Sequence, residues 1–232
     1  WFFLLPSYWC PRRIASYSEK KSRVFPSVYE PDPNKPLPSG ITRGLEVSNL
    51  RKEFVSEHGT VIAVDNLSLD MFRDQVFALL GHNGAGKTTT INMLSGMFPV
   101  TSGDAILHTR DKRQLSISEH LGALKNALGV CPQHDVLYPD LTVKEHLKIL
   151  ARIKGIQGST IQEEVDKAIQ LVGLTEKVNA YARSLSGGQK RKLSICLALI
   201  GNSELVFLDE PTSGVDPYSR RSMWEVIRRA KK

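Results

Sequence analysis

The chain has 232 residues, of which 41% are hydrophobic, and it carries a formal net charge of +7. This length suits one domain with a sizeable core plus an appendage. The three cysteines are scattered and show no C-x-x-C spacing, so they indicate neither a disulfide framework nor a zinc site. The basic residues are not interleaved with aromatic residues as in RNA- or DNA-binding modules, so the charge does not predict nucleic-acid binding.

The first 43 residues differ from the rest in composition. An apolar run at residues 1–5, far too short to span a bilayer, is followed by basic residues between positions 12 and 23. This order is expected where a chain leaves a membrane on its cytoplasmic side. Prolines between residues 26 and 38 then predict a stiff, extended linker. We expect residues 1–43 to be a juxtamembrane segment and linker, cut from a longer polytopic protein, and the globular domain to cover residues 44–232.

A phosphate-binding loop is indicated at residues 81–88. The apolar run 76–80 predicts a buried parallel strand, and the following segment Gly-His-Asn-Gly-Ala-Gly-Lys-Thr fits the G-x-x-x-x-G-K-[ST] pattern. A helix predicted from Lys87 to Met97 would place backbone N–H groups and the positive end of its dipole at a phosphate. Lys87 would contact the β- and γ-phosphates of ATP, and the Thr88 hydroxyl would bind Mg²⁺. The expected nucleotide contacts in this loop are Gly81, His82, Asn83, Gly84, Ala85, Gly86, Lys87, Thr88 and Thr89.

Between this loop and the middle of the chain, residues 104–108 predict a short strand, and residues 109–128 are charged and of uncertain form. Another short apolar strand begins near residue 129 and ends at Gln133. The neutral Gln133 amide could reach both Mg²⁺ and an attacking water, so it is a candidate sensor of the γ-phosphate.

Helices dominate the next stretch. Thr142-x-x-Glu145 is a capping box followed by apolar residues at helical spacing, and a second helix is predicted over residues 161–172. Ser186 then opens a helix that runs to about Ile200, and two glycines leave the N–H groups of its first turn uncovered, which creates a second anion site. The basic residues at 190–192 could face phosphate, although for most of them a solvated helix face is favoured.

Two adjacent carboxylates follow the apolar run 205–208, which predicts a second buried strand. Ligands of α/β sheets bind at the C-terminal ends of the strands. Asp209 is suited to hold Mg²⁺, and Glu210 is suited to orient and deprotonate the water that attacks the γ-phosphate. An acidic turn at a strand end is the alternative for a lone Asp-Glu-Pro, but the phosphate loop favours the catalytic interpretation.

In order, these motifs resemble the ATP-binding cassette (ABC) family: phosphate loop, Gln133, Leu-Ser-Gly-Gly-Gln at 185–189, Asp-Glu, and Ser-Gly-Val-Asp at 213–216. The likeness covers about residue 45 to the end of the chain. The strings GHNGAGKTTTINMLSG, CPQHDVLYPDLTVKEHL, LSGGQKRKLS and LDEPTSGVDPYSRR are similar to the A subfamily of eukaryotic ABC transporters, whose full-length members mostly move lipids.

The resemblance implies an α/β fold of the P-loop NTPase type, with a mostly parallel sheet, an antiparallel N-terminal β part and an inserted helical subdomain at about 135–203. In this family, the helical subdomain contacts the coupling helices of membrane domains. An early aromatic stacks under adenine, for which Phe54 is the candidate, although a partly buried strand aromatic is an equal alternative. Two domains sandwich ATP head to tail, which makes Ser186, Gly187, Gly188, Gln189 and Asp216 nucleotide-binding residues in addition to the phosphate loop and Gln133.

The resemblance therefore predicts an ATPase on the cytosolic face of a membrane, with ATP and Mg²⁺ as cofactors. The Mg²⁺ ligands would come from Thr88, Gln133 and Asp209, and the catalytic residues would be Glu210, Lys87 and Gln133. The expected partners are a second nucleotide-binding domain and the transmembrane domains, with lipid bound only by the membrane domains. No nucleic-acid partner is expected.

One feature departs from the family pattern. The family has a switch histidine downstream of the Asp-Glu pair, whereas every histidine here lies at or before His146. Asp216-Pro217 opens a final helical stretch. We expect the C-terminal end of the fold, with that histidine, to be missing, and ATP binding to be more robust than hydrolysis. The alternatives are a soluble ABC-type ATPase acting on ribosomes or DNA, and a regulatory nucleotide-binding half that does not hydrolyse ATP.

Overall fold

The computed structural model describes residues 2–3, 41–57, 59–201 and 203–230. Most of the predicted juxtamembrane segment and linker, residues 4–40, lies outside the described residues, so its role stays a prediction. No helix in the described ranges combines the length and the apolar character needed to cross a bilayer.

An antiparallel sheet forms the N-terminal part of the domain, as predicted. Along its second strand Leu45, Val47 and Leu50 are buried, because one face of the sheet packs on the core. Within residues 109–128, whose form the sequence left uncertain, the structure has a short strand and a short helix. In the order β3-β2-β5-β6, the strands are β3 (Gly59–Phe72), β2 (Arg43–Ser56), β5 (Ser102–His108) and β6 (Gln114–Ser116).

A parallel sheet forms the centre of the molecule. Its last strand along the sequence is buried throughout, as predicted for residues 205–208. The short strand at the N-terminus lies between the strand of the phosphate loop and the strand of the Asp-Glu pair. In the order β4-β1-β8-β7, the strands are β4 (Phe77–Ala78), β1 (Phe2–Phe3), β8 (Leu205–Leu208) and β7 (Leu128–Cys131).

The strand before the phosphate loop is shorter and less buried than the sequence predicts. β4 has two residues, and Val76 and Leu80 beside it are 41% and 65% exposed. Within the described residues β4 pairs only with β1, at two positions, so most of the apolar run is not enclosed by neighbouring strands. The prediction of a buried strand over residues 76–80 is therefore wrong in its extent, because an apolar run does not reveal how many strands flank it.

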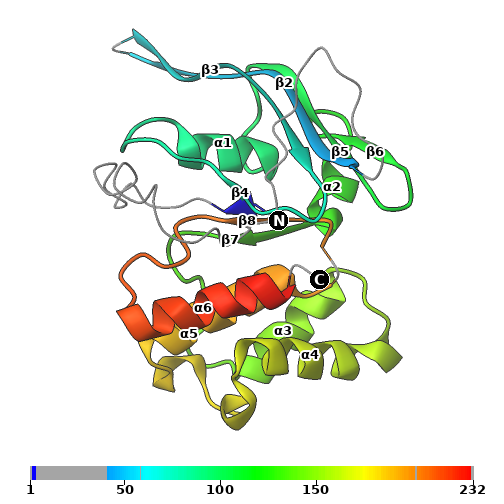
Figure 1. Cartoon of the computed structure of the whole chain (residues 1–232), viewed down its shortest axis with the longest axis vertical. Coiled ribbons are helices and arrows are strands. Elements are labelled where there is room, and N and C mark those ends of the chain that lie inside the picture. The colour runs from blue at the N-terminus through cyan, green and yellow to red at the C-terminus, as the bar shows by residue number, and fades with distance from the viewer. Residues whose placement is uncertain (1, 4–40, 58, 202, 231–232) are drawn as a thin grey trace, which may run out of the picture.

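Helices occupy two sides of the central sheet (Figure 1). Helix α1 (Lys87–Leu94) lies between the central sheet and the antiparallel sheet, and its apolar residues join the core of that sheet. It ends before the predicted Met97 because Gly96 turns the chain with a φ of 71°. The other described helices are α2 (Leu121–Ala127), beside β6 and β7, and α3 (Val143–Ile153), α4 (Gly158–Val172), α5 (Gly187–Leu199) and α6 (Pro217–Ala230), which cover the opposite face of the central sheet, with 3₁₀ turns at Thr175–Lys177 and Ala182–Ser184.

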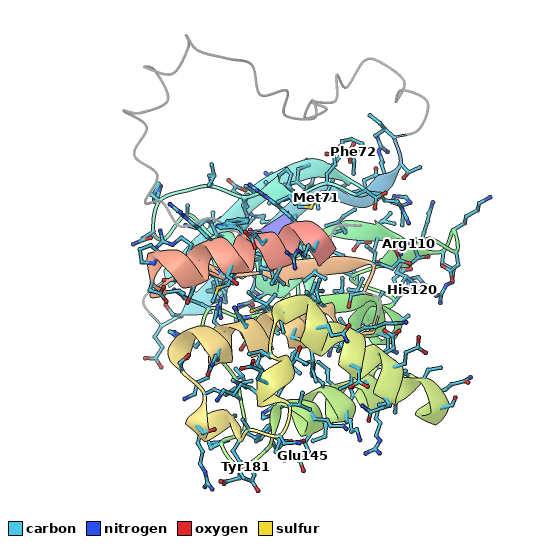
Figure 2. The ribbon with its side chains drawn as sticks, turned by 60° about the horizontal axis from the view of Figure 1, so that its bottom comes forward. Met71, Phe72, Arg110, His120, Glu145 and Tyr181 are labelled. Carbon is cyan, nitrogen blue, oxygen red and sulfur yellow. The ribbon has the colours of Figure 1, made fainter. Side chains whose placement is uncertain are left out.

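The helical part follows the sequence prediction closely at its start. Thr142 caps α3 in a complete capping box with Glu145, and Thr142 also forms a bridge with Tyr181. Figure 2 shows Glu145 and Tyr181 together at one end of the molecule, with Phe72 near the other end. The helical part and the antiparallel sheet therefore lie on opposite sides of the strands that carry the motifs.

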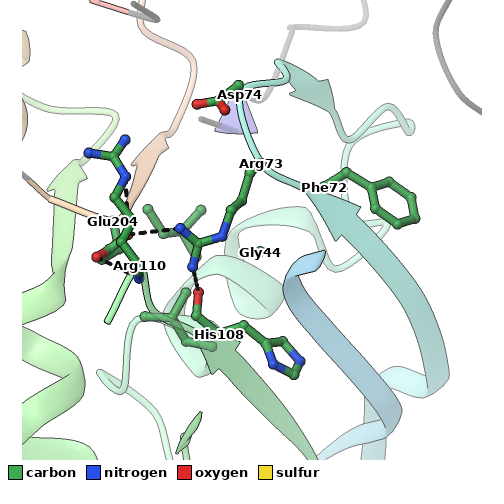
Figure 3. Close-up of a pocket in the computed structure, with 9 residues that line it drawn as sticks. Gly44, Phe72, Arg73, Asp74, His108, Arg110 and Glu204 are labelled. Atoms are coloured by element: carbon green, nitrogen blue, oxygen red, sulfur yellow. Dashed lines mark hydrogen bonds and ion pairs between the residues drawn. The ribbon is translucent and has the colours of Figure 1, made fainter. Parts of the chain in front are cut away.

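Charged side chains tie the antiparallel sheet to the segment just before β8 of the central sheet (Figure 3). Glu204, just before β8, accepts a hydrogen bond from the backbone N–H of Arg110 at 3.0 Å. Its carboxylate also lies 3.7 Å from the guanidinium groups of Arg73 and Arg110. Arg73 follows β3 and also donates to the carbonyl of His108 in β5. These residues line a hollow of about 200 Å³.

Candidate functional site

The phosphate loop is shaped by glycines in a backbone conformation that other residues rarely adopt. Gly84 and Gly86 have φ angles of 83° and 82°. A Cβ atom on Gly86 would lie 2.3 Å from the carbonyl oxygen of Ala63 in β3, so only glycine fits there. Gly86 also precedes α1 without a side-chain cap, which leaves the N–H groups of the first turn available to an anion.

Lys87 lies across this loop. Its ammonium group donates to the carbonyls of Gly81 at 2.8 Å and His82 at 2.9 Å. The positive charge is thus held over the loop by neutral acceptors, and a phosphate placed in the loop would meet it directly. The phosphate contact of Lys87 stays a prediction.

Thr88 and Asp209, far apart in the sequence, come together beside the loop. The Thr88 hydroxyl donates to a carboxylate oxygen of Asp209 at 3.1 Å, and Asp209 is 5% exposed. Burial raises the pKa of Asp209, and the hydrogen bond from Thr88 lowers it in part. A divalent cation would favour the ionised carboxylate. These oxygen donors fit Mg²⁺, which is commonly held by few carboxylates together with phosphate oxygens and water.

Gln133 and Glu210 also meet, although they are separated by 77 positions. The Gln133 side-chain amide donates to a Glu210 carboxylate oxygen at 3.0 Å. Glu210 has a φ of 43°, in the left-handed region, directly after the buried strand β8. The predicted sensor and the predicted general base therefore lie in contact at the same edge of the sheet.

The signature segment opens α5 as predicted. Ser186 accepts from the backbone N–H of Gln189 at 3.3 Å, and the Gln189 side chain accepts from the backbone N–H of Ser186 at 3.0 Å. Ser186 and Gly187 are exposed, whereas a Cβ atom on Gly188 would lie 3.0 Å from the hydroxyl of Ser219 in α6. One side of the signature is thus packed on α6, and its Ser186 end is open to solvent.

Asp216 and Phe54 have local roles in the structure. The Asp216 carboxylate accepts from the backbone N–H of Ser219 at 2.9 Å, which caps the start of α6. Phe54 is 41% exposed and lies edge-on to Phe98, with 6.0 Å between ring centroids. Lys52 lies 5.1 Å from the centroid of the Phe54 ring. The nucleotide contacts of Asp216 and Phe54 stay predictions. Phe98 was not among the residues that the sequence predicted for the site.

Arg191 is a further residue that sequence reasoning missed. It belongs to the basic run for which a mostly solvated face was favoured, yet it is 3% exposed. Its guanidinium contacts the backbone around both Gln133 and Glu210. An arginine within a basic run after a helix start gives no sequence signal for this burial, because the acceptors come from distant loops.

An apolar groove of about 260 Å³ lies beside Gln133 on the helical part. Val136, Tyr138, Ile149 and Ile153 line it and are substantially exposed. His146 fixes one wall: its Nε2 accepts from the backbone N–H of Tyr138 at 2.9 Å. Apolar side chains gathered and exposed in this way are typical of protein-binding surfaces.

The comparisons with known proteins agree with this arrangement. Residues 64–213 match the family model described as ABC transporter. The human phospholipid-transporting ATPase ABCA3 is 42% identical over 241 residues, which cover 100% of this chain and 13% of that protein. ABC transporter A family member 6 of Dictyostelium discoideum is 43% identical over 234 residues, covering 100% of this chain and 14% of that protein. The chain therefore spans only a small part of the length of these relatives.

Solved structures show the same fold. A superposition on cbiO1 from Clostridium perfringens, part of the ABC transporter complex cbiONQ, has a TM-score of 0.70 at 24% identity and covers 82% of this chain and 74% of that chain. The dimeric bacterial ABC transporter cassette MJ0796 gives a TM-score of 0.69 at 20% identity and covers 81% of this chain and 82% of that chain. These likenesses confirm the predicted fold class.

Proposed function

The chain belongs to the ABC transporter family, and we propose that it is the nucleotide-binding domain that binds Mg-ATP, hydrolyses it and drives a membrane transporter. One observation carries the proposal. The Thr88 hydroxyl contacts Asp209 and the Gln133 amide contacts the adjacent Glu210, which supports Thr88 and Asp209 as the metal-binding pair and Gln133 and Glu210 as the water-activating pair.

The chemistry follows from these positions. Backbone N–H groups of the loop and the Lys87 ammonium hold the β- and γ-phosphates and stabilise the charge that develops on them. Thr88 and Asp209 would hold Mg²⁺, which would neutralise phosphate charge. Glu210 accepts a proton from the attacking water, and Gln133 fixes the Glu210 carboxylate and the water in line with the γ-phosphate.

A second nucleotide-binding domain completes the site. The open Ser186 end of α5 presents uncovered N–H groups, and a γ-phosphate held by the phosphate loop of a partner domain would fit there. The solved dimeric cassette with the same fold supports this arrangement. ATP binding would close the dimer, and hydrolysis would reopen it.

The membrane domains dock on the apolar groove next to Gln133. A short amphipathic helix fits such a groove through its apolar face, against side chains such as Tyr138 and Ile153. Pro132 lines the groove and directly precedes Gln133, so docking there can act on the pair formed by Gln133 and Glu210. The domain would then lie on the cytosolic face of a membrane. The relatives named as phospholipid-transporting ATPases support a lipid as the transported molecule.

The test compares Mg-ATP affinity and turnover of the full-length polypeptide with those of Glu210→Gln and Lys87→Ala, and follows dimerisation of this chain by light scattering. We expect Glu210→Gln to bind ATP and form a lasting dimer while turnover falls by about 10²-fold or more. Lys87→Ala should lose affinity and turnover together. ATP binding without turnover in the unsubstituted protein would instead identify a regulatory domain.

A further inference from the structure

Arg191 is a buried cation whose hydrogen-bonding capacity is completely used. A guanidinium has five N–H donors. The Arg191 side chain lies in the second turn of α5, and its Nε, Nη1 and Nη2 atoms all donate to protein oxygens. The acceptors are the carbonyls of Pro211 at 2.8 Å, Pro132 at 2.7 Å, Asp209 at 2.9 Å and Glu210 at 3.1 Å, and the carboxylate of Asp135 at 3.2 Å.

These acceptors belong to the two segments that carry the water-activating pair. One group consists of consecutive carbonyls at residues 209–211, which surround Glu210. The other group, Pro132 and Asp135, flanks Gln133. Ser194, one turn further along α5, donates to the same Asp135 carboxylate oxygen at 2.8 Å. A single rigid fork on α5 thus holds the backbone behind both members of the pair.

The conformation of Glu210 explains why such a clamp is needed. A non-glycine residue with a φ of 43° costs of the order of 1–3 kcal/mol and persists only where its surroundings fix it. The Nη2 atom of Arg191 binds the carbonyl of Glu210 and that of the preceding residue, which fixes the peptide planes on both sides of the strained bond. A lysine could not reproduce this fork, because its ammonium is a single point on a flexible chain.

We propose that Arg191 is a positioning residue for ATP hydrolysis: it holds Glu210 in its left-handed conformation and in register with Gln133. This inference rests on the proposed role of Glu210 as general base. Arg191 donates to no residue of the phosphate loop, and it contacts the backbone carbonyl of Asp209 and not its carboxylate oxygens, so we expect its loss to reduce water attack more than nucleotide binding.

Arg191 also connects the signature helix to the turn that carries the general base. Ser186 caps the helix that carries Arg191, and the two lie within the first turns of α5.

The experiment uses the full-length polypeptide that carries this domain and measures kcat, Mg-ATP affinity and melting temperature for Arg191→Lys. The matched control is Arg183→Lys, because Arg183 is an exposed arginine whose guanidinium contacts Asp140 and the Tyr181 ring at the surface and contacts neither Gln133 nor Glu210. We expect Arg191→Lys to lower kcat by about 30- to 100-fold, since misplacement of a catalytic group by 1 Å can cost about 10²-fold. Its ATP affinity should stay within about 2-fold of the unsubstituted protein, and the control should match that protein in every measurement.

A folded Arg191→Lys variant with unchanged kcat would overturn the inference, as would equal losses of ATP affinity and turnover, which a purely structural role predicts. If Arg191→Lys does not fold, Asp135→Asn serves instead, because it weakens only the clamp on the Gln133 segment. That variant should lower kcat by about 5-fold at unchanged affinity, and an unchanged kcat would overturn the inference. Glu210→Gln, measured in parallel, separates the two proposals: if it still hydrolyses ATP, the proposed role of Glu210 fails first.

Discussion

At the scale of single residues, the site contains a strained residue, Glu210, that its neighbours hold in place. Glu210 is held in the left-handed region by contacts from α5, and its side chain is fixed by Gln133. Strained residues at functional sites are tolerated when the surrounding structure determines them. The left-handed conformation directs the Glu210 carboxylate differently from an extended residue at the end of a strand. The strain therefore lowers the stability of the fold but fixes the direction of the general base.

Replacing Glu210 by glycine tests this effect of the strain. Glycine adopts a positive φ freely, which relieves the strain, although it loses more backbone entropy on folding. Relief of strain is the larger effect, so Glu210→Gly should raise the free energy of unfolding by about 1 kcal/mol while hydrolysis is lost. Chemical denaturation and ATP turnover measure the two effects. Asp74, with a φ of 55° and far from the phosphate loop, is the control. Asp74→Gly should gain stability and keep full turnover, and a destabilised Glu210→Gly would contradict the account of strain.

Lys154 is a second residue whose environment has a measurable consequence. Its ammonium donates to the carbonyl of Ile200 at 2.9 Å and to the Ser203 hydroxyl at 2.5 Å, beyond the end of α5. Burial lowers the pKa of Lys154 from 10.5 to about 8. Between these two values the unfolded chain binds more protons than the folded chain, so the contribution of Lys154 to stability increases as the pH rises.

The prediction concerns the difference in unfolding free energy between the unsubstituted protein and Lys154→Met. We expect this difference to shift in favour of the unsubstituted protein as the pH rises from about 8 to 10.5, and to be flat below that window. Urea denaturation at a series of pH values measures it. A difference that does not change across the window would show that Lys154 keeps its ordinary pKa in the folded protein.

At the scale of elements, local signals fix the starts of the helices that surround the site. Thr142 accepts from the backbone N–H of Glu145 at 3.2 Å, and the Glu145 carboxylate accepts from both the backbone N–H and the hydroxyl of Thr142 at 2.8 and 2.7 Å. These hydrogen bonds lower the pKa of Glu145, the backbone one most. The part of the cap that Glu145 forms therefore depends on an ionised carboxylate.

Thr142→Ala should lower the free energy of unfolding by about 1 kcal/mol near neutral pH. The folded-state pKa of Glu145 lies below its ordinary value of 4.5, so the part of the contribution that comes from the Thr142 hydroxyl donating to the Glu145 carboxylate is present above that value and is lost as the pH falls through the folded-state pKa. The difference in stability between the two proteins should thus become smaller in acid. Denaturation curves at pH 7 and pH 3 give the comparison, with Thr142→Ser as the conservative control, and an equal difference at both pH values would contradict it.

The sequence predicts elements with strong local signals and misses contacts between distant ones. The glycine loop, the capping box at Thr142 and the start of α5 at Ser186 depend on neighbours within a few residues, and the structure confirms all three. The extent of β4 depends on which strands flank it, and the burial of Arg191 depends on loops at residues 132–135 and 209–211. Neither can be inferred from spacing in one sequence. The motifs thus predict which residues gather at the site, but not which residue holds them there.

At the scale of the whole molecule, β8 connects two hydrophobic cores. Leu205 and Phe207 belong to the core shared with the antiparallel sheet and α1, whereas Val206 and Leu208 belong to the core of the helical part. This follows from the alternation of side chains along a strand. The strand that delivers Asp209 is therefore fixed by both halves of the domain, which explains how a shift of either half can reach the site.

Glu204 is the polar counterpart of this connection, because it joins the start of β8 to both Arg73 and Arg110 of the antiparallel half (Figure 3). Its side chain is 20% exposed, so water screens the pairs only in part. We expect Glu204→Gln to lower the free energy of unfolding by about 1–2 kcal/mol, since the partly buried Arg73 guanidinium and the exposed Arg110 guanidinium lose their charge partner. Glu163→Gln, which removes a solvent-exposed pair with Lys167, should leave the melting temperature unchanged. Thermal unfolding followed by circular dichroism measures both, and equal melting temperatures for the two variants would show that the hydrophobic cores alone hold the two halves together.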